Sequence, residues 1–207
     1  MNTSSGAILV LSGPSGAGKS SLISRIIDHI GATYFSISTT TRAMREGETD
    51  GIHYHFVSVE EFKREIEAEM FLEYALVHGN YYGTSLSPVK KALKEGKLVI
   101  FDIDVQGHDA VQSRLSDITT SVFITTPTLE ELKSRLYNRR TDSEEIIAKR
   151  LEMAIREVQR ISEYDFLVVN DDLEEAAKVL ISIAKAARMK IPTQQINEFV
   201  QLWAAQE

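Results

Sequence analysis

Apolar residues along this 207-residue chain follow two spacings that alternate. Short β-branched or aromatic runs, typical of buried strands, occur at residues 7–11, 34–37, 98–103, 121–125 and 166–169. Between them, apolar positions three or four residues apart predict amphipathic helices after residue 19 and at residues 105–115, 128–137, 144–162 and 173–189. This alternation predicts an α/β fold with a mainly parallel sheet and helices on both faces.

Two intervals interrupt this alternation. Residues 38–88 are rich in threonine, glycine, tyrosine and charged residues, with a helical pattern at 59–70, which indicates a lobe inserted into the core. Residues 137–143 are polar and rich in arginine, which predicts a mobile loop. After Pro192, residues 195–204 form a last helical pattern. Its apolar side chains, which are Ile196, Phe199, Val200 and Trp203, need a surface to pack against.

Composition excludes several classes of protein. The 43% apolar and 26% charged fractions are those of an ordinary globular domain, and no run approaches the 18 apolar residues of a membrane span. The first residues have neither a basic leader nor an apolar signal core, so we expect a cytoplasmic protein. The chain has no cysteine, which excludes disulfides and thiolate metal sites. The net charge of −7 argues against binding of nucleic acid polymers.

The glycine-rich segment at residues 13–20, GPSGAGKS, matches the phosphate-binding pattern G-x-x-x-x-G-K-[ST]. It lies between a predicted strand and a predicted helix, which is the structural context in which this pattern binds phosphate. Glycines allow the loop N–H groups to converge on a phosphate, and Lys19 adds a full positive charge. The hydroxyl of Ser20 can hold Mg²⁺. The segment therefore predicts a nucleotide phosphate site.

A second chemical signal is the apolar strand that ends in Asp102 and Asp104. A strand that ends in carboxylates is where such proteins keep an acid for Mg²⁺ or its waters. The alternative for Asp104 is that it only caps the helix that begins near Gln106. Because the two aspartates are two residues apart and point the same way, a shared polar cleft is the better account.

Arginines form two clusters that are far apart in the sequence. Arg42 and Arg45 belong to the first cluster, and Arg135, Arg139, Arg140 and Arg150 belong to the second. Residues 133–160 carry eight basic and five acidic side chains, a positive excess within an acidic protein. Two clusters indicate two phosphate-bearing ligands, and phosphoryl transfer depends on this kind of charge neutralisation.

The sequence resembles guanylate kinases over residues 7–190. The segments that carry the resemblance are GPSGAGKSSL (13–22), SISTTTRAMREGETDGIHYHFV (36–57), FLEYALVHGNYYGTS (71–85), VIFDIDVQG (99–107), RLYNRRTDSEEIIAKRL (135–151) and YDFLVVNDD (164–172). The resemblance implies transfer of the γ-phosphoryl group of ATP to GMP, and to dGMP, with Mg²⁺, to give GDP and ADP in purine nucleotide metabolism. It implies a P-loop NTPase core (about 1–37, 89–136 and 160–190), a GMP-binding lobe (about 38–88), an arginine-bearing lid (about 137–159) and a C-terminal helix (about 193–205), together one domain.

Site residues carry over from the family to matching positions of this chain. The resemblance assigns GMP to Ser38, Arg42, Arg45, Glu48, Tyr54, Glu73, Tyr82, Thr84 and Asp104. It assigns ATP to Gly13, Pro14, Ser15, Gly16, Ala17, Gly18, Lys19, Ser20, Ser21, Asn170 and Asp171, and Mg²⁺ to Ser20 and Asp102. The residues that it implies for catalysis are Lys19, Arg42, Arg135, Arg139 and Arg150.

The assigned chemistry favours guanine over adenine. Guanine presents adjacent N1–H and N2–H₂ donors that the carboxylate of Glu73 can accept together, while the hydroxyls of Ser38 and Thr84 can donate to O6. Adenine has the opposite polarity on that edge and would leave buried groups unpaired.

Other interpretations stay open at this point. Guanylate-kinase-like domains also occur as scaffolding modules that bind phosphorylated peptides, although such modules typically lack an intact phosphate loop or the lid arginines. A P-loop kinase for another nucleoside monophosphate is the second rival. His53 and His55 have the spacing of metal ligands, but alternation along a strand explains them better. In the lid, Arg140 stands where the family often has glycine. The sequence leaves open whether the chain forms a homo-oligomer.

Overall fold

The computed structural model describes residues 6–77, 79–138 and 142–205. Its centre is a five-stranded sheet of order β2-β7-β1-β8-β9 in which every neighbouring pair is parallel. The strands are β1 (Ala7–Ser12), β2 (Thr33–Phe35), β7 (Leu98–Asp102), β8 (Thr119–Thr125) and β9 (Phe166–Val169). The predicted parallel sheet is therefore confirmed, and all five predicted strands belong to it.

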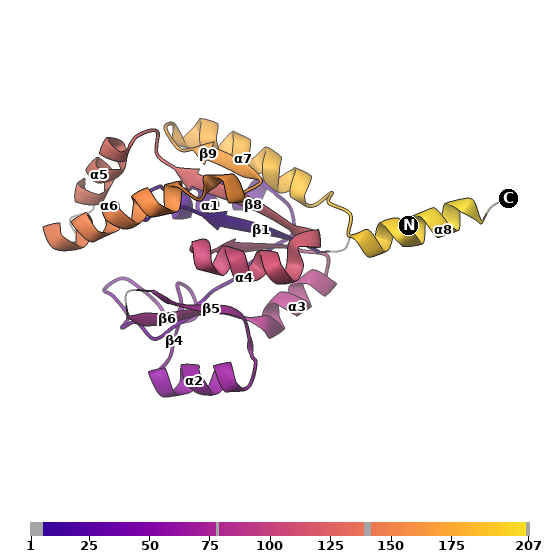
Figure 1. The fold of residues 1–207 in the computed structure, drawn as a ribbon, viewed down its shortest axis with the longest axis horizontal. Helices are drawn as coiled ribbons and strands as arrows, with labels where there is room; N and C mark the ends of the chain where they lie inside the picture. Colours follow the sequence, from indigo (N-terminus) through magenta and orange to yellow (C-terminus); the bar gives the residue numbers. More distant parts are fainter. Residues whose placement is uncertain (1–5, 78, 139–141, 206–207) are drawn as a thin grey trace.

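Helices cover both faces of this sheet (Figure 1). Helices α1 (Lys19–Ile26) and α7 (Leu173–Ala187) lie on one face, and α3 (Leu86–Lys94) and α4 (Val105–Leu115) lie on the other. Strand β1 serves both layers, because side chains alternate along a strand. Leu9 and Leu11 pack with α1 and α7, whereas Ile8 and Val10 pack with α3 and α4. Because β1 lies in the middle of the sheet and helices cover both faces, its side chains are apolar on both faces.

The remaining elements flank this core. Helices α5 (Leu129–Asn138) and α6 (Glu144–Val158) pack together at one end of the core (Figure 1). Three short 3₁₀ helices, η1 (Ile27–His29), η2 (Ser116–Ile118) and η3 (Ile161–Glu163), follow α1, α4 and α6. Helix α8 (Thr193–Ala204) projects from the opposite end of the molecule. None of the helices in the described ranges is both long and apolar enough to span a bilayer.

A second sheet of order β4-β3-β6-β5 lies within the proposed lobe. Its strands are β3 (Thr39–Thr40), β4 (His55–Phe56), β5 (Phe71–Val77) and β6 (Asn80–Ser85), and α2 (Val59–Glu67) covers it. The fully buried ring of Phe62 on α2 stacks on Phe71 at 4.5 Å and on Tyr81 at 5.2 Å between centroids. This small aromatic core joins α2 to the sheet, because each buried aromatic ring removes a large apolar area from water.

Some boundaries differ from the sequence prediction. Helix α3 runs across residue 88, where Pro88 was interpreted as the end of the lobe. Pro88 is the third residue of that helix, and proline is tolerated in a first turn because the N–H groups there have no partner within the helix. The predicted loop begins late, because Tyr137 and Asn138 still belong to α5. The predicted helix at 144–162 ends at Val158, followed by η3.

Candidate active site

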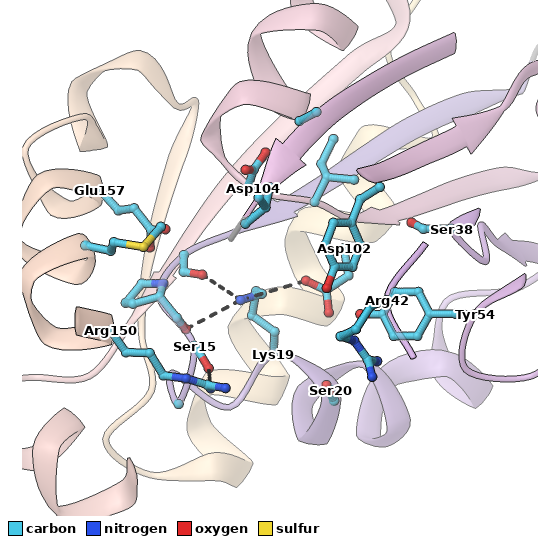
Figure 2. A pocket seen from close by; sticks show the side chains of 18 of the residues that line it. Ser15, Lys19, Ser20, Ser38, Arg42, Tyr54, Asp102, Asp104, Arg150 and Glu157 are labelled. Atoms are coloured by element: carbon cyan, nitrogen blue, oxygen red, sulfur yellow. Dashed lines mark hydrogen bonds and ion pairs between the residues drawn. The ribbon is translucent and has the colours of Figure 1, made fainter. Parts of the chain in front are cut away.

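A cavity of about 370 Å³ opens at the carboxyl ends of β1 and β7, between the lobe and helix α6 (Figure 2). The loop between β1 and α1 lines it, together with lobe residues on one side and residues of α6 on the other. Ligands of open α/β sheets bind outside the carboxyl ends of the strands, so this cavity is the candidate site.

The loop between β1 and α1 has the shape that phosphate binding needs. Gly13 has φ of 135°, and a Cβ there would lie 1.9 Å from the carbonyl oxygen of Ile124, so only glycine fits. Gly18 has φ of 91° and precedes α1, whose first residue is Lys19. The Lys19 Nζ donates to the carbonyl oxygen of Gly13 at 2.6 Å. The ammonium is therefore held over the loop, where the α1 N-terminus adds partial positive charge.

The two predicted carboxylates both line the cavity but have different partners. The Oδ1 of Asp102 lies 3.8 Å from the Lys19 Nζ; burial raises the pKa of Asp102, and the charge of Lys19 opposes that rise. The Oδ1 of Asp104 accepts hydrogen bonds from the backbone N–H groups of Gln106 at 3.1 Å and Gly107 at 2.9 Å. Asp104 is thus the N-cap of α4 as well as a cavity residue. Asp102 is the better candidate for a metal ligand.

The lobe side of the cavity carries the first arginine cluster. The guanidinium of Arg42 donates to both carboxylate oxygens of Glu48, at 3.0 and 2.7 Å, and lies 5.3 Å from the centre of the Tyr54 ring. These hydrogen bonds lower the pKa of Glu48. Arg45 and Tyr82 line the same side, and the rings of Tyr54 and Tyr82 meet edge to face. A bidentate pair fixes the plane of a guanidinium, so Glu48 orients Arg42.

Glu73 is a buried carboxylate at the back of the same cavity. Glu73 belongs to β5 and is only 7% exposed, and this burial raises the pKa of its carboxyl group to about 7. The hydroxyl of Thr84, on the paired strand β6, donates to the Glu73 Oε1 at 2.5 Å. Ser38 lines the cavity, whereas Thr84 is not among the described residues that line it. Thr84 therefore orients Glu73, a role different from the predicted hydrogen bond to guanine O6.

The arginines of the second cluster differ in their contacts with the phosphate loop. The Arg150 Nη1 on α6 donates to the Ser15 hydroxyl of the loop at 2.5 Å, so this helix contacts the phosphate loop directly. The Arg135 Nε donates to Glu131 at 2.7 Å on its own helix. The Arg135 Nη1 would lie 4.0 Å from a Cβ at Gly18, so it is close to the loop without lining the cavity. Arg139 and Arg140 lie outside the described residues.

Four predicted ATP residues lie away from the cavity. Ala17 and Asn170 are buried, and the Asn170 side-chain amide donates to the Ala17 carbonyl oxygen at 2.8 Å. Asn170 therefore braces the loop from behind. Ser21 and Asp171 are exposed and are not among the described residues that line the cavity.

Sequence analysis missed Glu157, which also faces the cavity (Figure 2). It lies on α6 with Met153 and Arg150, and the spacing of 150, 153 and 157 places all three on one helical face. Burial raises the pKa of Glu157, and among the described residues its Oε2 has no hydrogen-bond partner. The sequence signal that could have found Glu157 is its spacing of seven residues from Arg150, which places it on the same helical face as that predicted site residue.

Metal binding by His53 and His55 has no support in the described part of the chain. The His53 Nδ1 accepts a hydrogen bond from the Thr49 N–H, and neither histidine belongs to a cluster of metal-ligating groups. The cluster that does occur among the described residues contains His108, Asp109 and Glu163. The guanidinium of Arg160 pairs with both carboxylates of that cluster, which compensates part of their charge.

Comparison with known proteins identifies the family. Residues 5–187 match the model of the guanylate kinase family. The chain belongs to the guanylate kinase family. It is 70% identical to the guanylate kinase of Sulfurimonas denitrificans, with 98% of each chain covered. It is 54% identical to the guanylate kinase of Wolinella succinogenes, with 100% of this chain and 96% of the relative covered.

A solved guanylate kinase has the same fold. The crystal structure of the guanylate kinase from Anaplasma phagocytophilum superposes with a TM-score of 0.75 at 33% identity, covering 91% of this chain and 89% of that one. The predicted α/β fold and the predicted membership of the guanylate kinase family are thus confirmed. The chain is a kinase of this family, and the scaffolding interpretation is set aside.

Proposed function

We propose that this protein transfers the γ-phosphoryl group of ATP to GMP, and to dGMP, and releases ADP and GDP. One observation carries the proposal: a phosphate loop and a buried guanine-type acceptor, Glu73, open into the same cavity. Charged groups from both sides converge between them, Arg42 from the lobe and Arg150 from α6. Two phosphate-bearing ligands in one cavity are what transfer between nucleotides requires.

The donor side would hold ATP at residues 13–21. Loop N–H groups, the α1 N-terminus and Lys19 would bind its phosphates. Ser20 and Asp102 fit Mg²⁺, because a hydroxyl and a carboxylate are the hard oxygen ligands that this ion prefers, and both residues line the cavity beside Lys19. When bound, the ion would neutralise charge on the phosphate oxygens. Asn170 and Asp171 are proposed to lie near adenine, with Asn170 also supporting the loop through Ala17.

The acceptor side would bind GMP at both ends. Arg42, Arg45, Tyr54 and Tyr82 would bind its phosphate, since they share one wall of the cavity. Glu48 would keep the Arg42 guanidinium in place through the bidentate pair. At the base, Ser38 and Asp104 would flank the guanine, and Glu73 would accept from its N1–H and N2–H₂ groups. Thr84 would keep one Glu73 oxygen fixed, which restricts the other to a defined direction.

Transfer itself needs little covalent help from the protein, because positioning and charge stabilisation account for most of the catalysis. Lys19 and Arg42 would hold the two phosphates that react. Arg150, which already contacts the loop through Ser15, would stabilise charge on the transferring group, together with Arg135 and Arg139. We propose a division into core, lobe (38–88) and lid (137–159) that moves to enclose both ligands and exclude water.

We propose a cytoplasmic location and no nucleic acid or membrane partner, since both substrates are small nucleotides and the net charge is −7. The test of the function is a coupled assay of ADP release with Mg²⁺, ATP and each of GMP, dGMP, AMP, CMP and UMP. We expect turnover with GMP and dGMP, with AMP lower by about two orders of magnitude or more in kcat/KM. Comparable turnover of AMP, or none of GMP, would refute the proposal.

GMP affinity should depend on pH through Glu73. Its pKa in the folded protein is about 7, and guanine donors require the ionised carboxylate. We therefore expect the GMP dissociation constant to be flat near pH 8 and to rise below pH 7, by up to about tenfold per pH unit. Calorimetric titrations of the parent and of Glu73→Gln would measure this. The GMP phosphate titrates equally in both, so the difference isolates Glu73, and equal slopes would contradict the assignment.

The same raised pKa has a consequence for stability. Between the ordinary value of 4.5 and about 7, the folded chain keeps a proton that the unfolded chain has released. The contribution of Glu73 to the free energy of unfolding is therefore fully present below pH 4.5 and is lost as the pH rises to about 7.

A further inference from the structure

Among the described residues, the hydrogen bonds that hold helix α8 to the rest of the protein lie at its beginning. The Thr193 N–H and hydroxyl donate to the carboxylate of Asp117 at 2.9 and 2.8 Å. Just before the helix, the Lys190 Nζ donates to the carbonyl oxygens of Ser116 at 3.0 Å and Thr119 at 2.5 Å. From there α8 extends away from the core, on the opposite side from α5 and α6 (Figure 1). Within its range Thr193–Ala204, no residue is buried.

The exposed helix carries an apolar face. Ile196, Phe199, Val200 and Trp203 follow the spacing i, i+3, i+4, i+7, and their exposed fractions are 46%, 55%, 55% and 73%. Leu202 lies beside Phe199 on the helical wheel and is 54% exposed. A 12-residue helix is marginal in water unless its apolar face packs against something. The face therefore needs a partner.

Helix α8 also lies outside the region that defines the family. The family match ends at residue 187, six residues before α8 begins. The cavity lies near the opposite end of the core, beside α6, and none of its lining residues comes from α8. The exposed face is therefore not explained by the phosphotransfer site.

Charge decides among the kinds of partner. In Thr193–Ala204 the only charged residue is Glu198, so the helix has no lysine or arginine to bind anionic lipid headgroups. The chain as a whole has a net charge of −7, which makes copies repel each other over most of their surface. The nearly neutral α8 is where two copies can approach at least cost. The side-chain amides of Gln195 and Asn197, which can both donate and accept, border the apolar face.

We propose that α8 is a self-association helix, through which two copies of this chain pair antiparallel. Antiparallel pairing about a two-fold axis sets Trp203 against Ile196 and Phe199 against Val200 of the second copy, large side chains against smaller ones. It also keeps the two acidic cores at opposite ends of the helix pair. Burying these side chains on both copies removes on the order of 1,000 Å² from water, near the lower limit for a specific interface.

The full-length chain supplies its own reporter, because Trp203 is its only tryptophan. Sedimentation equilibrium over a wide concentration range should give twice the monomer mass of 23.2 kDa, with dissociation on dilution. Trp203 emission should shift to shorter wavelength as the dimer forms. Phe199→Glu should give a monomer with solvent-exposed emission, and Gln201→Glu, which adds the same charge on the opposite face of α8, should remain dimeric. Both variants should keep the parent's circular dichroism and GMP kinase activity.

Several results would overturn the proposal. The parent could be monomeric with shielded Trp203 emission, which would mean that α8 folds onto its own chain, or monomeric with exposed emission. A dimer that persists in Phe199→Glu would place the interface elsewhere. A shift of Trp203 emission on adding phosphatidylglycerol vesicles to the dilute protein would mean that the face binds membranes.

Discussion

Replacement of Lys19 by methionine should lower turnover of GMP by about two orders of magnitude or more. The ammonium lies over the phosphate loop, 2.6 Å from the Gly13 carbonyl oxygen and 3.8 Å from the Asp102 carboxylate. Charge on the transferring phosphoryl oxygens is stabilised more in the transition state than in bound ATP, so the loss should appear in kcat. Methionine keeps most of the aliphatic length and removes only the charge.

The measurement is steady-state kinetics with ATP and GMP, beside thermal unfolding to show that the variant is folded. Lys178→Met is the matched control, because this exposed lysine pairs with Glu175 on the surface of α7, away from the cavity. Its turnover should equal that of the parent. A Lys19 variant within about fivefold of the parental kcat would show that the loop lysine does not act on the reacting phosphoryl group.

Replacement of Glu73 by glutamine should lower kcat/KM for GMP about 5- to 150-fold, equivalent to 1–3 kcal/mol. The Thr84 hydroxyl donates to one Glu73 oxygen at 2.5 Å, and in the variant the amide oxygen would keep that position. The amide NH₂ group would then face the guanine N1–H and N2–H₂ donors, which replaces an attraction by an unpaired contact between donors. Discrimination against AMP should weaken in parallel, since the substitution lowers kcat/KM for AMP less than it lowers kcat/KM for GMP.

The change should appear in the KM for GMP and leave the KM for ATP unaltered. Glu67→Gln makes the same chemical change at an exposed site at the end of α2 in the same lobe, and it should behave as the parent. If the KM for ATP rises instead, Glu73 belongs to the donor site. If neither KM changes, the buried carboxylate does not read the base.

Local patterns were enough to predict the core and the phosphate loop. The apolar run of β1 and the segment at 13–20 are contiguous, so strand, loop and helix follow from short-range chemistry: glycines at φ that other residues avoid, and Lys19 at a helix start. The same holds for β7 and its aspartates, because the position of Asp102 beside the loop follows once two parallel strands are adjacent. Resemblance to a family then supplied roles that no single segment could.

Tertiary structure decided what depends on residues far apart in the chain. The second sheet includes β3 and β4, two residues each, which are too short to show a periodicity. Strand β3 is held by its antiparallel pairing with β6, and β4 by its parallel pairing with β3. Burial of Glu73, and with it the raised pKa, exists only because β5 pairs with β6 and brings Thr84 to it. Asn170 similarly acquires its contact with the loop across 153 residues.

The C-terminal helix shows most clearly the difference between what the sequence predicts and what the tertiary structure decides. Spacing alone predicted that residues 195–204 form a helix with an apolar face, since a period of 3.6 residues is a local property. Whether that face is covered by the same chain is not local: it depends on where Pro192 and the Thr193–Asp117 contact direct the helix. The fold directs it away from the core, because the apolar faces of the central sheet are already covered by α1, α7, α3 and α4.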